Sequence, residues 1–337
     1  MDRKKKLVFY FGVDYIEMQK ISGSFNVMKY IFGPVPSRRL GYSLGVDVLP
    51  SQKTCNMNCI YCELGRGHKT FSRPSYCPPA EDIIFEVENY CVKNRDFDCV
   101  TVTASGEPTL HEDLPTILSN IKKLTSKPLV VLTNSSTLSK NSIRKALEQV
   151  DLVLPSLDAA TVKGFRSINR PHPDLDIERI VEGLSNLRKT MRGQMWLEIL
   201  LVSGMNDTTK ELYALKDALS RIAPHKIQLN TVARPPAESW ARPVPSSRLK
   251  EICKFFGKSA EIVIDFHTQM QRANKIILES EIMDTLKRRP LSLEDLRVLF
   301  GMYDGTETVL RRLLNNGIVQ ERHVKGRTFF VAINEHV

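Results

Sequence analysis

Three cysteines, Cys55, Cys59 and Cys62, lie in one short segment with the sequence CNMNCIYC. Thiolates at this spacing can each bind one iron of a cubic [4Fe–4S] cluster, which usually takes four cysteine ligands. Because only three cysteines are present here, one iron is left open to bind another molecule. The segment therefore predicts an iron–sulfur site with a vacant coordination position.

Two other uses of these cysteines are less consistent with the sequence. A zinc site needs four ligands, and although His68 could be the fourth, no second C-x-x-C or H-x-x-x-H pair is present. Structural disulfides are typical of small secreted chains, whereas this chain has 337 residues and an odd count of seven cysteines, and we expect no secretion signal. The four other cysteines are dispersed along the chain and predict no second cluster.

Short apolar runs that alternate with amphipathic segments must position the cysteine loop. We expect buried strands at residues 44–49, 99–103, 129–133, 152–156, 196–202 and 226–231. We expect helices near residues 80–93, 113–124, 139–148, 176–190, 208–222 and 246–256. This alternation predicts an α/β fold with a parallel sheet and right-handed crossovers.

Six such strand–helix units match a partial (β/α)6 barrel. In α/β barrels the chemistry gathers at the C-terminal ends of the strands, and the cysteine loop leaves the first expected strand at that end. Polar residues follow later strands: Ser105, Gly106 and Glu107 after the second, Asn134 after the third, and Ser156 and Asp158 after the fourth.

One acid, Glu198, lies inside the fifth expected strand, in the apolar run WLEILL. A buried acid is costly unless it is paired or hydrogen-bonded. Hydroxyl groups of a ligand or a nearby arginine would each satisfy Glu198, and the sequence leaves both open.

The pattern C-x-x-x-C-x-aromatic-C, with Tyr61 as the aromatic residue, resembles the cluster loop of the radical S-adenosylmethionine (SAM) superfamily. In that superfamily the open iron chelates the amino and carboxylate groups of SAM. An electron from the cluster then cleaves SAM to methionine and a 5′-deoxyadenosyl radical. The resemblance implies that Cys55, Cys59 and Cys62 are the metal ligands and that SAM is the second cofactor.

The turn after the second strand resembles the superfamily's Gly-Gly-Glu motif, with Ser105 in place of the first glycine, although a plain strand-to-helix turn would have a similar sequence. The resemblance implies that this turn orients the amino group of SAM, that Tyr61 packs near the adenine, and that Ser156 or Glu198 meets the ribose. The residues expected to bind SAM are Tyr61, Ser105, Gly106, Glu107, Asn134, Ser156, Asp158 and Glu198.

The segments GPVPSRRLG and SLGVD before the cysteines resemble a narrower group over about residues 29–260. This group contains archaeal and bacterial radical SAM iron–sulfur oxidoreductases and is classed with the wyosine-base synthases of tRNA. Those synthases also carry N-terminal cysteines for a second cluster. This chain has no cysteine before Cys55, which argues against wyosine chemistry.

The sequence divides into three parts: a poorly ordered extension at 1–27, with Met28 as the natural start, a radical SAM core at 28–272, and a module at 275–337. In this module helices at 276–286, 292–299 and 306–315 and strands at 318–324 and 327–333 follow the order of a winged helix. The residues Arg311, Arg312, Arg322, Lys325 and Arg327 outweigh Glu321 and would suit a phosphate backbone. Because the whole module has a net charge of only +1, from ten basic and nine acidic residues, a protein-docking or substrate-presenting role fits equally.

The net charge of +10, from 48 basic and 38 acidic residues, favours an anionic partner. RNA is the leading substrate hypothesis, through modification of a molecule such as tRNA. The alternatives are a small metabolite or a peptide as substrate, or a non-enzymatic iron–sulfur regulator that binds DNA. The absence of an apolar run of 18 residues predicts no membrane span, and we expect a cytoplasmic enzyme supplied with electrons by a ferredoxin- or flavodoxin-type donor.

Overall fold

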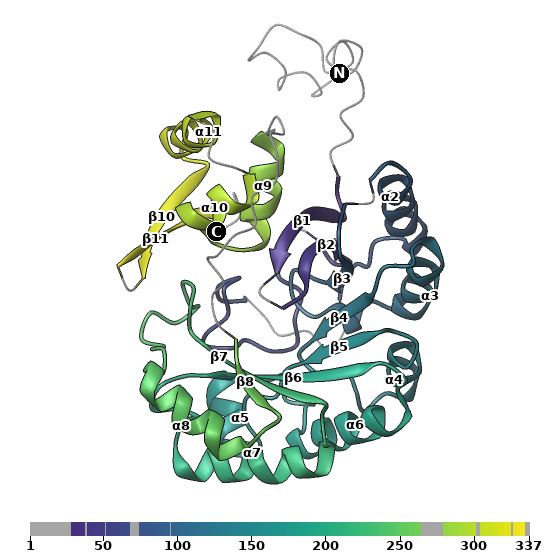
Figure 1. Ribbon diagram of the computed structural model, residues 1–337, viewed down its shortest axis with the longest axis vertical. Helices are drawn as coiled ribbons and strands as arrows, with labels where there is room; N and C mark the ends of the chain where they lie inside the picture. The colour runs from purple at the N-terminus through teal and green to yellow at the C-terminus, as the bar shows by residue number, and fades with distance from the viewer. Residues whose placement is uncertain are drawn as a thin grey trace, which may run out of the picture.

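The computed structural model describes residues 28–37, 39–50, 52–67, 74–94, 96–263, 279–300, 304–324 and 326–333 (Figure 1). Several sequence predictions concern residues outside these ranges: the extension at 1–27, His68 as a fourth metal ligand, the end of the core and start of the C-terminal module between 264 and 278, and Lys325 in the basic group of that module. They stay predictions.

The predicted parallel α/β architecture is confirmed. The main sheet has eight strands in the order β1-β2-β3-β4-β5-β6-β7-β8 within the described residues; β1 is antiparallel to β2, and every other neighbouring pair is parallel. The strands are β1 (Ile31–Ser37), β2 (Gly41–Asp47), β3 (Cys99–Thr103), β4 (Leu129–Thr133), β5 (Leu152–Pro155), β6 (Gln194–Leu201), β7 (Lys226–Thr231) and β8 (Ala260–Ile262). The six expected strands are β2 to β7, and β1 and β8 add an edge on each side.

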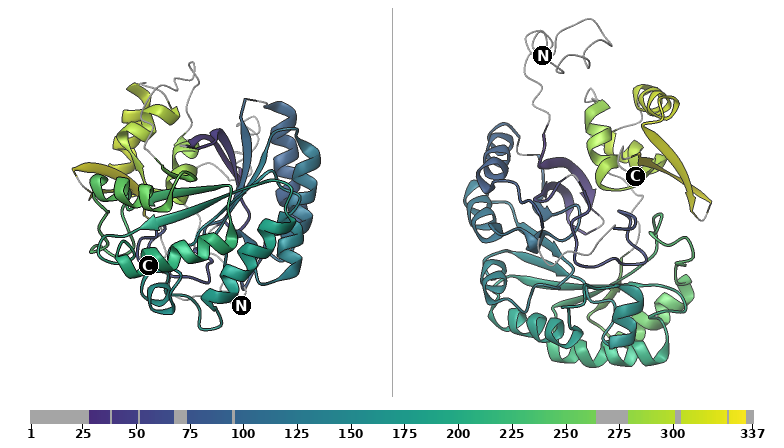
Figure 2. Two further views of the ribbon diagram at one scale, coloured as in Figure 1. Left: turned by 60° about the horizontal axis from the view of Figure 1, so that its bottom comes forward. Right: turned by 180° about the vertical axis from the view of Figure 1, so that it is seen from behind.

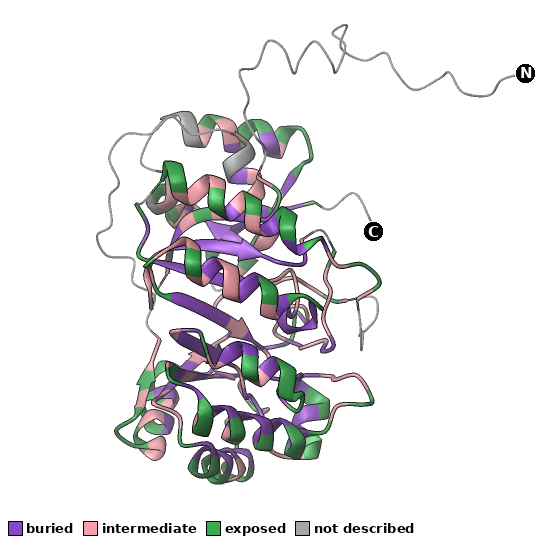
Figure 3. Ribbon diagram, turned by 90° about the vertical axis from the view of Figure 1, so that its right-hand side faces the viewer, coloured by how far each residue is buried: buried purple, intermediate pink, exposed green. Residues whose placement is uncertain are grey.

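Helices connect the parallel strands and form an arc outside them (Figure 1). They are α2 (Ala80–Lys93), the short 3₁₀ helix η1 (Pro108–Leu110), α3 (Leu114–Leu124), α4 (Asn141–Leu147), α5 (Val162–Ile168), α6 (Ile177–Thr190), α7 (Thr209–Ile222) and α8 (Ser246–Phe256). Figure 3 shows mostly buried residues in the strands and a mixture of buried and exposed residues in the helices. This is the pattern of amphipathic helices that cover a buried sheet. The sequence analysis missed only α5 and η1 among these helices.

The sheet is strongly curved, as the contacts of one arginine show. Arg39, in the turn between β1 and β2, pairs with Glu198 on β6 and donates a hydrogen bond to Gln228 Oε1 on β7 at 3.0 Å. In a flat sheet β2 and β6 would lie roughly 19 Å apart, at about 4.8 Å per strand, which is farther than an arginine side chain reaches. The two ends of the sheet therefore turn toward each other.

The C-terminal module contains α9 (Glu279–Arg288), β9 (Leu291–Ser292), α10 (Leu293–Phe300), α11 (Asp304–Asn315), β10 (Val319–Val324) and β11 (Arg327–Ala332). Its three strands form a sheet in the order β10-β11-β9, and its own apolar core includes Leu286, Leu296, Leu313 and Phe330. The expected order of three helices and a hairpin is present, with β9 as an additional strand. Figures 1 and 2 show the module beside β1 and β2.

One residue of the module reaches into the larger domain. Arg288, at the end of α9, lies 4.9 Å from the ring centre of Phe32 on β1 and donates a hydrogen bond to the carbonyl oxygen of Lys29 at 3.0 Å. Its Nε lies 3.4 Å from the carboxylate of Asp47, at the end of β2.

Across the described parts of the chain, no helix combines the length and the apolar character needed to cross a membrane.

Candidate active site

The loop that carries the three cysteines is tied to the turn after β3 by main-chain hydrogen bonds. The amide of Thr54 donates to the carbonyl oxygen of Ser105 at 2.8 Å, and the amide of Glu107 donates back to the carbonyl of Thr54 at 2.9 Å. Gly106 lies between them with φ +143°, and a Cβ added there would be 1.8 Å from the oxygen of Thr54. Only glycine permits this close approach, so Gly106 positions the residue next to Cys55.

The other side of the loop is tied to the end of α5. The amides of Asn58 and Ile60 donate to the carbonyls of Asn169 and Ile168, each at 2.9 Å. The amide of Glu238, in the loop after β7, donates to the carbonyl of Ile60 at 2.9 Å. Main-chain hydrogen bonds from three surrounding segments therefore hold the loop in its conformation.

The three cysteine thiols lie close enough for the charge on one to affect the pKa of another. Burial raises the pKa of Cys55 to about 12, and the negative charge of Glu107 acts in the same direction. Burial also raises the pKa of Cys59 strongly, and charge on Cys55 and Cys62 adds to the effect. Bare thiolates are therefore disfavoured at Cys55 and Cys59, and these two sulfurs become good ligands only when a metal centre compensates their charge.

The donor set fits a cluster better than a single ion. Within the ranges that the structure describes, no group of three or more His, Cys, Asp or Glu side chains is placed to hold one metal ion. The described cysteines are all free of disulfides. A cubic cluster takes one thiolate for each iron, so its ligands are spaced more widely than those of one ion. Three free thiols on one fixed loop thus suit a [4Fe–4S] cluster with one open iron.

Two side-chain amides point at these sulfurs. Asn134 Nδ2 lies 3.4 Å from Cys55 Sγ, and Asn169 Nδ2 lies 3.5 Å from Cys59 Sγ. Asn134 was predicted from its place after β4. Asn169 was missed because it follows the unpredicted helix α5, and its neighbours RSINRP give no recognisable signal.

Four of the residues predicted to bind SAM line one small cavity: Tyr61, Asn134, Ser156 and Asp158. Its volume of ≈ 40 Å³ leaves room for only a few water molecules. The hydroxyl of Tyr61 donates to the buried carboxylate of Asp158, which also accepts from the amide of Leu200 at 2.9 Å. Burial raises the pKa of Asp158 to about 6. These residues form the polar part of the cavity lining, which also contains apolar residues such as Met57 and Phe165.

The acid of the predicted SAM turn joins two strand ends. The carboxylate of Glu107 is buried and accepts hydrogen bonds from Thr133 Oγ1 and from the amide of Asn134, both at 2.6 Å. It also accepts from the amide of Thr109 at 3.1 Å. Burial raises the pKa of Glu107. Its carboxylate therefore holds the end of β3 against the end of β4.

Ser105 is bound in a similar way to the end of β2. Its amide and its hydroxyl donate to the two oxygens of Asp47 at 3.0 and 2.8 Å. The sequence analysis missed Asp47, although it is an acid inside an expected buried strand, at 44–49, which is the signal that singled out Glu198. Asp47 and Glu107 together align the ends of β2, β3 and β4.

Glu198 stands apart from this group. Its carboxylate pairs with Arg39, and it is not among the residues that line the cavity. Of the two partners that the sequence left open for Glu198, an arginine is the one found. The side chains of both residues are largely buried, so the pair satisfies an acid that would otherwise be isolated inside the sheet.

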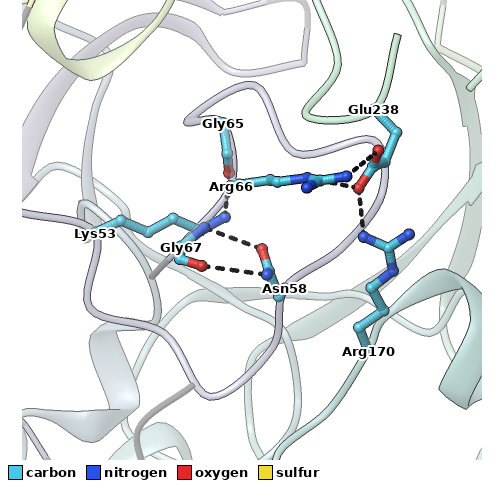
Figure 4. A network of polar contacts seen from close by, with 7 residues as sticks. All are labelled: Lys53, Asn58, Gly65, Arg66, Gly67, Arg170 and Glu238. Atoms are coloured by element: carbon cyan, nitrogen blue, oxygen red, sulfur yellow. Dashed lines mark hydrogen bonds and ion pairs between the residues drawn. The ribbon is translucent and has the colours of Figure 1, made fainter. Parts of the chain in front are cut away.

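A second charged network lies over the outer part of the cysteine loop (Figure 4). The buried carboxylate of Glu238 receives two hydrogen bonds from Arg66, at 2.9 and 2.7 Å, and one from Arg170. These hydrogen bonds lower the pKa of Glu238 to about 2. The side chain of Arg66 remains 66% exposed. This network thus places two arginines against one carboxylate beside the cysteine loop.

The comparisons with known proteins agree with this site. Residues 49–215, from the cysteine loop to α7, match the family model described as "Radical SAM superfamily". The fold and the cysteine loop therefore define a radical SAM enzyme, whose superfamily cofactors are a [4Fe–4S] cluster and SAM. The chain is 33% identical over 307 residues to a UPF0026 protein of Helicobacter pylori. The match covers 90% of this chain and 97% of the Helicobacter protein. The chain belongs to the family of these UPF0026 proteins.

Two further similarities concern a longer relative and a more distant structure. The chain is 34% identical over 302 residues to a GTPase Obg of Brachyspira hyodysenteriae; the match covers 88% of this chain but only 44% of that relative's length. Among solved structures, a radical SAM methyltransferase from Sphaerobacter thermophilus is 16% identical with a TM-score of 0.47, covering 65% of this chain and 66% of that one.

The predictions of an enzyme and of its two cofactors are confirmed, and a non-enzymatic regulator is set aside. The narrower likeness to the wyosine-base synthases stays a prediction.

Proposed function

We propose that Cys55, Cys59 and Cys62 each bind one iron of the [4Fe–4S] cluster and leave the fourth iron to SAM. The observation that carries this proposal is the pairing of the cysteine loop with the β3 turn and the end of α5, which gathers three free thiols on one fixed loop. When bound and reduced, the cluster supplies the electron that cleaves SAM to methionine and a 5′-deoxyadenosyl radical.

The surrounding residues orient SAM and exclude water. Ser105, Gly106 and Glu107 place main-chain groups beside the cysteine loop, because the side chains of Ser105 and Glu107 are held by the strand ends and Gly106 has none. Tyr61, Asn134, Ser156 and Asp158 form the wall nearest the adenosine part of SAM. Since Glu198 is paired with Arg39, Ser156 is the better candidate for the ribose.

The curved sheet supports a partial (β/α)6 barrel for the core domain at 28–272. The order of helices and strands supports a winged helix for the module at 275–337. Electrons would come from a low-potential donor of the ferredoxin or flavodoxin type. A cytoplasmic location, where thiols stay reduced, is the setting that this chemistry favours.

The substrate that we propose is RNA. Support comes from the net charge of +10, from the exposed Arg66 beside the cysteine loop, and from Arg311 and Arg322, which are exposed on α11 and β10. Arginines at these two places could hold a phosphate backbone while a base enters the site. A small metabolite or a peptide is the alternative.

The cofactor part of the proposal is tested by anaerobic reconstitution with iron and sulfide. We expect about four irons and four sulfides per chain, the stoichiometry of one cluster, and release of 5′-deoxyadenosine with dithionite and SAM. Cys59→Ala should lose both. Cys91→Ala, on α2 and outside the loop, is the matched control and should retain both. Full cluster content in Cys59→Ala would overturn the ligand assignment.

The substrate part is tested by binding of small RNA at several salt concentrations. We expect affinity to fall steeply as salt rises, and we expect Arg322→Ala to weaken binding and to reduce the salt dependence. RNA should also accelerate formation of 5′-deoxyadenosine. No binding at low salt would reject RNA and favour the metabolite or the peptide.

A further inference from the structure

Each of two cysteine sulfurs lies opposite the amide nitrogen of an asparagine that comes from a different part of the chain. Asn134, after β4, lies 3.4 Å from Cys55 Sγ through its Nδ2. Asn169, after α5, lies 3.5 Å from Cys59 Sγ through its Nδ2. Both distances suit an N–H···S hydrogen bond, in which the larger sulfur atom allows a longer contact than oxygen.

The orientation of each amide is fixed by its other partners. Asn134 Oδ1 accepts from the amide of Ser136 at 3.0 Å, and its Nδ2 also donates to Asn56 Oδ1 at 3.1 Å. A flipped amide would lose the first bond and place two oxygens against each other in the second. The nitrogen of Asn134 must therefore face Cys55.

Asn169 is fixed by a carboxylate. Its Nδ2 donates to Asp158 Oδ2 at 2.8 Å. A flipped amide would instead place its oxygen against this carboxylate oxygen, and neither atom can donate a hydrogen bond. One hydrogen of the amide thus points at Asp158 and the other at Cys59. Because the main chain of Asn169 also accepts from the amide of Asn58, the side chain is positioned together with the cysteine loop.

Reduction of a cluster adds one electron, and part of the added negative charge falls on the thiolate sulfurs. Hydrogen-bond donors to these sulfurs stabilise the reduced state and so raise the reduction potential. The effect is large where water is scarce, because a buried dipole is poorly screened. Asn134 and Asn169 are both partly or fully buried at this point of the site.

We infer that Asn134 and Asn169 are positioning residues that set the reduction potential of the cluster through N–H···S bonds to Cys55 and Cys59. The inference rests on the proposed ligands. The electron comes from an external one-electron donor, for which dithionite serves in the test. The two asparagines thereby determine how readily that donor reduces the cluster before SAM is cleaved.

The test compares Asn134→Leu, Asn169→Leu and the double variant with wild type after anaerobic reconstitution of the full chain. Leucine is close to asparagine in shape but donates no hydrogen bond. Iron and sulfide content is measured first, and the midpoint potential is then obtained by redox titration followed by electron paramagnetic resonance. The matched control is Asn58→Leu, because the side chain of Asn58 is in the same loop but bonds only to Gly67: its Nδ2 donates to the carbonyl oxygen at 3.3 Å and its Oδ1 accepts from the main-chain amide at 3.0 Å.

We expect each asparagine variant to shift the potential downward, with the double variant shifted most. At a fixed solution potential the ratio of reduced to oxidised cluster should fall about tenfold in the double variant, which is about 59 mV for a one-electron couple. Asn58→Leu should leave the potential unchanged. If the leucine variants fail to fold, Asn134→Ala and Asn169→Ala provide the same comparison.

An unchanged potential in fully loaded variants would overturn this inference and leave the ligand assignment intact. Failure of the wild-type chain to assemble a cluster would instead reject the proposed ligands. The two failures are thus distinguished by the iron and sulfide content of the wild type.

Discussion

The main chain of Gly106 lies directly against the carbonyl oxygen of Thr54, so that a Cβ at Gly106 would be 1.8 Å from that oxygen. Gly106, which the sequence resemblance associates with SAM, thus also fixes Thr54, the residue directly before Cys55. We therefore expect substitutions in this turn to disturb the cysteine loop as well as the proposed contact with SAM.

We predict that Gly106→Ala loses most of its cluster, because Thr54 must move away and Cys55 moves with it. Iron and sulfide content after reconstitution measures the effect. Gly257→Ala is the control: Gly257 also has a positive φ, +93°, but nothing lies within 4 Å of an added Cβ. The control should cost about 1–3 kcal/mol of stability from backbone strain alone and keep its cluster. Equal cluster content in both variants would refute this role for Gly106.

The pair of Arg39 and Glu198 should be structural. Arg39→Met leaves a largely buried carboxylate without its cation, and we expect the free energy of unfolding to fall by about 3–5 kcal/mol, the range for a broken buried pair. The double variant Arg39→Met/Glu198→Gln should recover much of this loss, because neither charge is then isolated. Urea unfolding of the two single variants and the double variant measures the coupling.

If Glu198 instead contacts the ribose, Glu198→Gln should weaken SAM binding while stability changes little. We expect the opposite pattern, with a loss of stability and unchanged SAM affinity in the protein that remains folded. Equilibrium dialysis with labelled SAM distinguishes the two results.

The charged network around Glu238 predicts a pH dependence of stability. Arg66 and Arg170 lower the pKa of Glu238 to about 2, below its value in the unfolded chain, so the unfolded state binds the proton more readily. The contribution of Glu238 is therefore fully present above about pH 5 and decreases as the pH falls toward 2, given an ordinary glutamate pKa of about 4.3. The stability difference between wild type and Glu238→Gln should shrink between pH 6 and pH 3. A difference that stays constant over that range would contradict this assignment.

Arg288 should fasten the C-terminal module to the core. Its side chain is only 12% exposed, and it contacts Phe32 and the carboxylate of Asp47, which in turn holds Ser105. Arg288→Met should cost ~1.5–3 kcal/mol, the range for a hydrogen bond to a charged group, and should make the module more susceptible to limited proteolysis. Arg297→Met is the matched control in the module, because its ion pair with Glu307 is exposed and should contribute at most about 1 kcal/mol.

The residues found by sequence analysis were those with a local signal. The spacing of Cys55, Cys59 and Cys62 is a property of one loop, and the strands and long helices follow from apolar periodicity over short windows. The class of enzyme and its cofactors could therefore be predicted before any contact was known. Strand β8 has only three residues and so offers too few periods to be recognised.

Partners of individual side chains required the tertiary structure. Arg39 and Glu198 are far apart in the sequence and meet only because the sheet curves, which no local pattern encodes. The amide of Asn169 reaches Cys59 because main-chain pairing brings the end of α5 against the cysteine loop. The sequence by itself thus determined which atoms could carry out the chemistry. The packing of strands and loops decided which groups surround those atoms, because such contacts depend on curvature and register summed over the whole domain.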